Sequence, residues 1–289
     1  MNVRLSGNEE KYVLEVLQNG FRGSYGSVFV SRLEEEIKKQ YGVEFAISFN
    51  NGTATMHAAL EALGVGVGDE VIVPPLTMAS TAFVVMQANA TPVFADVDRE
   101  TFCISPDSIK QQITEKTKAI ITVALYGLSP DMDAIQELVS GTNIKIIEDN
   151  AETYFSKYKN RLVGTIGDCS SFSFQSSKHL TSGEGGVVLA NDEKLATSIR
   201  RIQSLGYAGV GPSKAKISKL EIQEPGYDRH ICMGWNYRMP ELCAAVALGQ
   251  VERANELVSR RVDSANLFKE VLDETKCDWL IPQRSDPEY

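Results

Sequence analysis

Short apolar runs alternate with helical stretches along most of the chain. Seven runs predict buried strands, and they lie at Phe45–Phe49, Glu70–Pro74, Pro92–Asp96, Ala119–Leu125, Lys145–Glu148, Cys169–Phe174 and Gly186–Ala190. Helices are predicted between them, notably at Thr53–Leu63, Thr77–Ala88, Ser105–Ile113 and Met132–Val139. Strands that alternate with helices in this way predict a mostly parallel sheet with helices on both faces, a three-layer α/β fold.

The last third of the chain follows a different pattern. Residues Ser204–Arg229 are rich in Gly, Ser, Lys and Pro, which predicts a long, mobile connection of the kind that forms lids or partner contacts. Two helices are expected after it, at Pro240–Ala254 and Glu256–Leu272, and the apolar residues 279–281 resemble a strand. We therefore expect a large domain at residues 1–245 and, at 246–289, the beginning of a smaller α+β domain that this chain does not complete.

Composition narrows the class of protein. The 289 residues are 43% hydrophobic, enough to bury a large core. A net charge of −9 without a long basic run argues against nucleic-acid or anionic-membrane binding. We find no apolar stretch long enough to span a bilayer and no signal-peptide core at the N-terminus. A cytoplasmic protein is expected.

Cysteine and histidine spacing points away from disulfides and metals. The five cysteines lie far apart and form no CxxC pair, so they are expected to be reduced and mostly buried. His57, His179 and His230 lack the spacing of metal ligands. No metal is expected in this protein.

One lysine stands between an apolar strand and a glycine-rich turn, in the segment Phe172–Gly186. The strand delivers Lys178 to an edge of the predicted sheet, and the run Gly183–Gly186 turns the chain back. A lysine amine that is shielded from water at such a place can attack an aldehyde. Most lysines are solvated surface residues, so it is the flanking strand and turn that favour a catalytic role.

Asp149 follows the apolar segment that ends at Glu148. An aspartate buried beside the pyridine nitrogen of pyridoxal 5'-phosphate (PLP) keeps that nitrogen protonated, so that the ring can accept electrons. The alternative is an ordinary helix N-cap, which is a common role for aspartate after a strand. Spacing alone does not separate these two interpretations, and the presence of Lys178 favours the cofactor role.

The segment Asn51-Gly52-Thr53 opens a predicted helix. Free backbone N–H groups and the helix dipole favour a phosphate at that position, and Ser173 could add a hydroxyl. For Thr53, ordinary helix capping explains the residue about as well, and the two roles are compatible. A phosphate cradle, an acid and a lysine are what PLP requires. All three follow strand ends, so they could share one crevice.

Two other patterns have structural interpretations. The run Gly64–Gly68 resembles a dinucleotide loop, but it follows a helix and precedes a strand, the reverse of the required order. It is therefore predicted to be a helix stop and turn. The acidic pairs at 96–98 and 131–133 have no third ligand nearby in sequence, which favours loop and capping roles over metal binding.

Together these residues resemble the DegT/DnrJ/EryC1/StrS family, the PLP-dependent sugar aminotransferases of the aspartate-aminotransferase fold (fold type I). The resemblance covers most of the chain and is specific, because many motifs occur in one order. These motifs are Asn51–Ala54, Val73–Thr77, Tyr126-Gly127, Glu148–Glu152, Gly167-Asp168, the lysine segment and Gly234–Met239.

The resemblance implies roles for the groups that hold and activate the cofactor. Lys178 would bond covalently to PLP and shuttle a proton between the two reacting carbons. Asp149 would pair with the pyridine nitrogen. The phosphate would be bound by Gly52, Thr53 and Ser173.

Three further residues receive roles from the same resemblance. Met78 would pack over the ring, as a softer contact than the aromatic residue common there. Glu152 would lie near the ring hydroxyl, where many members have Gln. Asn236 would bind the phosphate of the cofactor held by a neighbouring subunit, which implies a homodimer with shared active sites.

Two further comparisons with the family pattern bear on the activity. A sister branch carries histidine in place of the lysine and performs a dehydration. Here Lys178 holds that position and His179 follows it, which favours transamination. The family's chain normally continues well beyond residue 289, so a truncated fragment is possible and part of the substrate-facing wall is expected to be absent.

The resemblance therefore implies an aminotransferase that converts a keto-deoxysugar nucleotide to an amino sugar for surface polysaccharides or glycosides. Glutamate is the expected amino donor, and pyridoxamine 5'-phosphate the expected second form of the cofactor. A cyclitol or another non-nucleotide ketone is an alternative substrate. A non-catalytic, PLP-binding regulatory protein is a second alternative, against which intact Lys178 and Asp149 argue.

Overall fold

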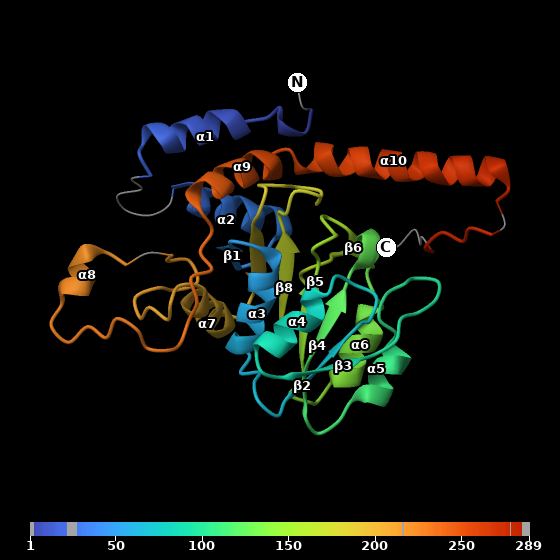
Figure 1. The fold of residues 1–289 in the computed structure, drawn as a ribbon, viewed down its shortest axis with the longest axis horizontal. Helices are drawn as coiled ribbons and strands as arrows, with labels where there is room; N and C mark the ends of the chain where they lie inside the picture. Colours follow the sequence, from blue (N-terminus) through green and yellow to red (C-terminus); the bar gives the residue numbers. More distant parts are fainter. Residues whose placement is uncertain (1–2, 22–27, 216, 278, 285–289) are drawn as a thin grey trace.

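The computed structural model describes residues 3–21, 28–215, 217–277 and 279–284. All seven predicted strands are present, and they form one sheet (Figure 1). In spatial order they are β1 (Phe45–Phe49), β9 (Gly186–Ala190), β8 (Cys169–Ser173), β5 (Lys145–Asp149), β4 (Thr117–Val123), β2 (Glu70–Val73) and β3 (Thr91–Phe94). β9 runs antiparallel to both neighbours and every other adjacent pair is parallel, which confirms the mostly parallel sheet.

Helices cover both faces of this sheet, and the fold has three layers (Figure 1). One face carries α3 (Gly52–Ala62), α4 (Ser80–Gln87) and α7 (Glu193–Gln203). The other carries α2 (Val28–Tyr41) and α9 (Glu241–Val251), then α5 (Pro106–Gln112) and α6 (Met132–Val139). Because successive strand residues face opposite sides, Ile147 packs in the first cluster and Ile146 in that of α6. This is why the strands are apolar throughout.

Helix α3 brings its N-terminus to the carboxyl edge of the sheet. The Asn51 side chain caps the helix by accepting a hydrogen bond from the Ala54 N–H at 2.8 Å. Most of the helix is buried between the sheet and its neighbours. The helix ends before Gly64, whose φ of +73° lets the chain turn toward β2. The helix stop and turn predicted for the run Gly64–Gly68 is therefore confirmed.

The remaining elements are short, except for one long helix. They are η1 (Val3–Leu5), α1 (Glu9–Gln18), η2 (Leu125–Gly127), the hairpin of β6 (Lys157–Tyr158) and β7 (Arg161–Leu162), α8 (Lys219–Gln223) and α10 (Ala254–Thr275). α1 packs on α9, and α8 interrupts the connection at 204–229. Both helices predicted after that connection are present as α9 and α10. The boundary predicted at residue 245 falls inside α9, and the division into two domains stays a prediction.

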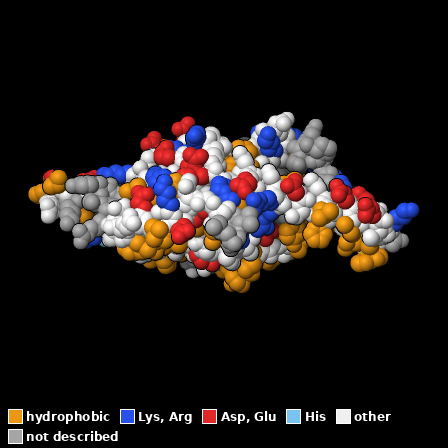
Figure 2. Space-filling model, turned by 90° about the horizontal axis from the view of Figure 1, so that it is seen from above, with side chains coloured by type: hydrophobic (Ala, Val, Ile, Leu, Met, Phe, Trp, Pro, Cys, Tyr) orange, Lys and Arg blue, Asp and Glu red, His pale blue; other side chains and the backbone are white. Residues whose placement is uncertain are grey.

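Helix α10 extends beyond the layered body (Figure 1). Only Ala254 and Leu257, in its first turn, are buried, whereas hydrophobic side chains further along it are exposed. In Figure 2, hydrophobic side chains lie along one edge of the end that α10 forms. No helix among the described residues is both long and apolar enough to cross a membrane.

The prediction of a strand at residues 279–281 was wrong. Trp279, Leu280 and Ile281 lie outside every strand and are exposed, and Asp278 lies outside the described residues. An apolar run becomes a strand only where another strand supplies hydrogen-bond partners. The described residues after α10 pair with no strand in this chain.

Candidate active site

A cavity of about 690 Å³, here called the inner cavity, opens where β5 and β8 end and α3 begins. It lies at the carboxyl ends of parallel strands, the usual position of a ligand in an open α/β sheet. Seven of the eight residues singled out from the sequence line it: Gly52, Thr53, Met78, Asp149, Glu152, Ser173 and Lys178. The crevice expected from their positions after strand ends is thus present.

Asp149 is the last residue of β5 and contributes to the buried wall of the inner cavity. Its side chain is 3% exposed and accepts hydrogen bonds from Thr81 Oγ1 at 2.9 Å and from the Ala151 N–H at 3.1 Å. Burial raises the pKa of this carboxyl, and the hydrogen bonds and the charge of Lys178 partly oppose the rise. No helix begins after Asp149, so the alternative of a helix N-cap is excluded. A carboxylate held here is arranged to meet a cation inside the cavity.

The start of α3 forms the opposite end of the inner cavity. The N–H groups of Gly52 and Thr53 precede the first intrahelical hydrogen bonds, and Asn51 rather than Thr53 caps the helix. A Cβ added at Gly52 would lie 3.0 Å from Ser173 Cβ, and one at Gly186 would lie 2.7 Å from Asn51 O. Glycine at both positions therefore keeps β8, β9 and α3 close around this end. Free N–H groups, a helix dipole and the Ser173 hydroxyl suit a phosphate.

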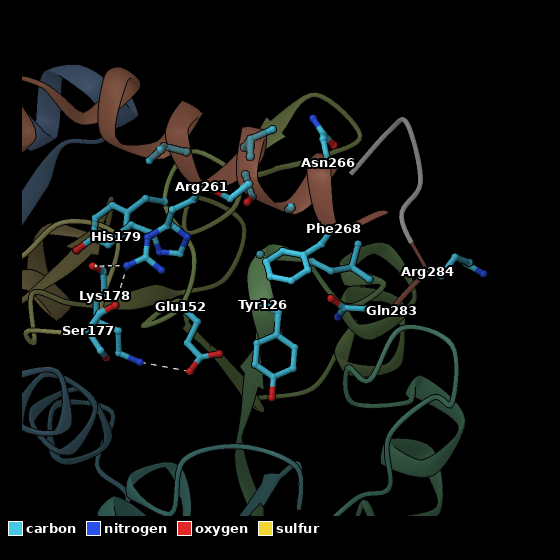
Figure 3. Close-up of a pocket in the computed structure, with 18 residues that line it drawn as sticks. Tyr126, Glu152, Ser177, Lys178, His179, Arg261, Asn266, Phe268, Gln283 and Arg284 are labelled. Carbon is cyan, nitrogen blue, oxygen red and sulfur yellow. Dashed lines mark hydrogen bonds and ion pairs between the residues drawn. The ribbon is translucent and has the colours of Figure 1, made fainter. Parts of the chain in front are cut away.

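Lys178 lies between Asp149 and a second carboxylate. Its Nζ is 3.3 Å from Glu152 Oε1, as Figure 3 shows, and its side chain is 19% exposed. The other oxygen of Glu152, Oε2, is buried and has no hydrogen-bond partner. An unsatisfied buried oxygen next to the lysine amine leaves an acceptor for a ligand hydroxyl. The donor set of this cavity therefore fits PLP, with its phosphate, ring nitrogen, ring hydroxyl and aldehyde.

Met78 and Asn236 have different relations to this cavity. Met78 lines it but is 72% exposed, so its side chain lies at the open side. Asn236 is not among the residues that line the inner cavity. It is exposed and its backbone forms an isolated bridge with Ser204.

Four residues that matter here were not found from the sequence. Thr81 contacts Asp149, and its position near the start of a helix next to the strand ends is a weak signal. Tyr237 lines the cavity, and its hydroxyl lies 3.0 Å from His57 Nδ1. Arg4 and Arg261 contact the backbone of the loop between β8 and β9 that carries Lys178, here called the lysine loop. No sequence pattern indicates either arginine.

A second hollow of about 740 Å³, the outer cavity, lies on the other side of Lys178 and Glu152 (Figure 3). Tyr126, Phe268 and Arg261 are among the residues that line it. His179 also faces it, and burial, followed by the charges of Arg261 and Lys178, lowers the pKa of its ring to about 4. The lysine is therefore reached from two sides.

The acidic pairs have the structural roles expected for them. The Asp131 side chain caps α6 by accepting from the Ala134 N–H, and Asp98 accepts from the N–H of Thr101 at 2.8 Å. No group of His, Cys, Asp or Glu is placed to hold a metal ion within the part of the chain that the structure describes.

Comparison with known proteins identifies the class. Residues 4–288 match the model of the DegT/DnrJ/EryC1/StrS aminotransferase family. The GDP-perosamine synthase of Escherichia coli O157:H7 is 41% identical over 92% of this chain and 68% of its own length. That of Caulobacter vibrioides is 39% identical, with 89% and 65% covered. A protein of Streptoalloteichus tenebrarius named as an L-glutamine:3-amino-2,3-dideoxy-scyllo-inosose aminotransferase is 37% identical, with 91% and 60% covered.

Solved structures agree with this match. An aminotransferase from Psychrobacter cryohalolentis superposes with a TM-score of 0.82 at 33% identity, covering 93% of this chain and 67% of its own. The Escherichia coli GDP-4-keto-6-deoxy-D-mannose-3-dehydratase with bound hydrated PLP has a TM-score of 0.81 at 26% identity, with 93% and 70% covered.

The site and fold thus define a PLP-dependent aminotransferase of fold type I. This chain belongs to the DegT/DnrJ/EryC1/StrS aminotransferase family. It spans 60–68% of the length of the three relatives named above.

Proposed function

We propose that this protein transfers an amino group to the keto carbon of a deoxysugar nucleotide, with glutamate as donor. The observation that carries the proposal is the inner cavity. It combines the amine of Lys178, the buried carboxyl of Asp149 and the N-terminus of α3. The names of two of the relatives, both GDP-perosamine synthases, support a nucleotide sugar as substrate. The amino sugar would serve polysaccharide or glycoside biosynthesis.

Each chemical group that lines the inner cavity would have a separate task. When bound, PLP supplies an electron sink for the carbanion that forms at the reacting carbon. Asp149, held by Thr81 and the Ala151 N–H, would keep a proton on the ring nitrogen. Lys178 Nζ would bond to the cofactor in the resting enzyme and, once displaced, carry the proton between the two carbons.

The remaining contacts would position the cofactor. Gly52, Thr53 and Ser173 would bind its phosphate, and Glu152 would accept from its ring hydroxyl through the oxygen that lacks a partner. Met78 would cover one face of the ring from the open side of the cavity. A ring in this position would make Met78 less exposed than it is here.

A homodimer with shared active sites is part of the proposal. Asn236 is exposed and lies outside the inner cavity of its own chain, as is required of a residue that reaches a partner's cofactor. Size-exclusion chromatography with light scattering tests the dimer. Mixing inactive Lys178→Ala chains with inactive Asn236→Ala chains tests sharing, because a mixed dimer regains one intact site.

We also place the protein in the cytoplasm. All five cysteines are free in the structure, which suits a reducing compartment.

The experiment that tests the substrate class runs the reaction in reverse. The protein, loaded with PLP, is incubated with GDP-perosamine and 2-oxoglutarate, and glutamate is measured. Glutamate formation that depends on both compounds and on Lys178 supports the proposal. If PLP binds and the half-reaction with glutamate occurs, but no sugar nucleotide is turned over, the substrate assignment is wrong.

An aminotransferase for a cyclitol is the second candidate. The relative from Streptoalloteichus tenebrarius, named for a scyllo-inosose substrate, is 37% identical to this chain. In a forward assay, a scyllo-inosose would then accept the amino group of L-glutamine, whereas GDP-perosamine with 2-oxoglutarate would give no glutamate.

A further inference from the structure

Three successive backbone carbonyls of the loop that carries Lys178 point out of the loop. Inside it, the Lys178 N–H donates to Gln175 O at 3.0 Å and the Ser177 N–H donates to Gln175 Oε1 at 2.7 Å. The carbonyls of Ser176, Ser177 and Lys178 instead face η1 and α10. Unsatisfied carbonyls would leave the loop free to turn the lysine side chain away from the inner cavity.

Two guanidinium groups satisfy these carbonyls. Arg4 Nη1 donates to Ser176 O at 2.6 Å, and Arg4 Nη2 donates to Lys178 O. Arg261 Nη2 donates to Ser177 O at 2.8 Å and to Lys178 O at 3.0 Å. Figure 3 shows Arg261 reaching from α10 to the loop. Each arginine thus bridges two carbonyls: Arg4 uses both terminal nitrogens of its planar guanidinium fork, whereas Arg261 uses Nη2 alone.

The arginines are themselves anchored. Gln250, which is fully buried in α9, donates to Arg4 O at 2.8 Å and accepts from the Thr181 N–H at 3.3 Å. Arg4 and the far end of the lysine loop are therefore tied to one side chain. Arg261 lies two turns into α10, a helix whose first turn is buried against the body.

Arg4, Arg261 and Lys178 are all cationic, so placing them at one loop costs electrostatic free energy. Burial and the charge of Arg261 lower the pKa of Arg4, and burial, followed by the charges of Arg261, Lys178 and Arg4, lowers the pKa of His179. Like charges at one loop repel each other. Charge-assisted hydrogen bonds to carbonyl oxygens offset this cost and give the loop one geometry.

We propose that Arg4 and Arg261 are positioning residues, whose guanidinium groups hold the carbonyls of residues 176–178 and thereby direct the Lys178 amine into the inner cavity. The inference rests on the proposed function only in taking Lys178 as the reactive amine. Neither arginine is proposed to touch the cofactor or the substrate.

The first test needs no cofactor and no activity. Hydrogen exchange of the full chain without PLP is compared in Arg4→Ala, Arg261→Ala and the control Arg260→Ala. Arg260 is the neighbour of Arg261 on α10 and pairs with Glu256 at 2.8 Å. We expect amides at residues 175–183 to exchange at least tenfold faster in the first two variants than in the control. Equal exchange in all three overturns the proposal.

The second test asks whether the lysine is displaced. The rate at which PLP becomes fixed to Lys178, trapped with borohydride, is expected to fall about tenfold in Arg261→Ala, since misplacement by about 1 Å can cost up to a hundredfold. Arg261→Lys should recover only part of the rate, and PLP affinity measured before bond formation should stay within about twofold. A normal rate in a variant whose loop exchanges faster contradicts a positioning role.

These outcomes are separable from failure of the proposed function. If the parent protein fixes PLP at Lys178 but does not react with glutamate, transamination is refuted. The exchange and trapping rates still decide whether the arginines position the lysine.

Discussion

The two cavities that meet at Lys178 are built in different ways. The inner cavity is formed by strand ends and a buried helix N-terminus, and its carboxyl group at Asp149 is buried and hydrogen-bonded to Thr81. The outer cavity is lined in large part by α10 and by exposed side chains such as Tyr126, which is 68% exposed. Asp149 and the start of α3 are thus fixed by the sheet, whereas the outer wall depends in large part on one helix.

The comparison shows which parts of the fold fix the positions of the site residues. Asp149, Ser173 and Gly52 are placed by strand register and a helix start, so their relative positions follow from the core. Lys178 lies on a loop, and arginines from distant parts of the chain hold that loop. Lys178, the proposed catalytic lysine, is therefore the point at which the outer cavity can influence the inner one.

The largest expected effect comes from removing the lysine. Lys178→Ala should lower the rate of amino transfer by about 10²–10⁴-fold or more, because both the covalent bond to the cofactor and the proton carrier are lost. The rate of glutamate-dependent transamination measures this. Lys110→Ala, an exposed lysine on α5, should react like the parent.

The next largest effect is expected at Asp149, in the buried wall of the inner cavity. Asp149→Asn keeps the shape but removes the charge that would hold a proton on the ring nitrogen, so the half-reaction should slow by about 10²–10³-fold. PLP should still bind. Thr81→Val removes the hydrogen bond to Asp149, together with a hydroxyl contact to Thr77, but leaves the carboxyl in place. It serves as the matched comparison, with a loss at least tenfold smaller. Equal losses would mean that the charge of Asp149 is not what matters.

A smaller effect, on PLP affinity, is expected at the start of α3, where the phosphate is proposed to bind. In Gly52→Ala the new Cβ would lie 3.0 Å from Ser173 Cβ, so β8 and α3 must separate. Affinity for PLP, measured by titration of its absorbance, should fall about tenfold, roughly the loss of 1.4 kcal/mol. Gly211→Ala is the control, because nothing lies within 4 Å of a Cβ at that position. Unchanged affinity in Gly52→Ala would argue against a phosphate there.

The smallest effect is on stability and lies at the junction of the cavities. Burial and the charges of Arg261, Lys178 and Arg4 lower the pKa of His179 from 6.5 to about 4, although Glu152 opposes them. The unfolded chain binds the proton more readily, so stability is fully present above pH 6.5 and falls as the pH drops toward 4.

We expect this loss to be about 1–2 kcal/mol, discounted for partial exposure of the ring. Urea unfolding of the parent and of His179→Gln at pH 7 and pH 5 measures it. The stability of the parent should fall more than that of the variant over this interval. A fall of the same size in both would place the titration elsewhere.

The sequence predicted the sheet well because its strands are buried on both faces. Ile146 and Ile147 pack on opposite sides, so apolar runs mark such strands plainly. The inner cavity followed, since its residues come directly after strand ends. Asp149 remained ambiguous from spacing, and only the absence of a following helix excluded the capping role.

What the sequence did not predict depends on contacts between distant segments. Arg4 lies 174 residues from the Lys178 carbonyl that it binds, and no periodicity links them. Gln250, in an apolar helix, gives no sign that it joins Arg4 to Thr181. The apolar residues Trp279–Ile281 suggested a strand, but a strand needs a partner, which a local pattern cannot supply.

The most direct test of the central claim is to find where PLP bonds to this chain. The protein is incubated with PLP, reduced with borohydride and digested, and the modified peptide is identified by mass spectrometry. We predict one modified residue, Lys178, and a yellow absorbance band before reduction that glutamate removes. PLP bonded to another lysine, or no band at all, would contradict it.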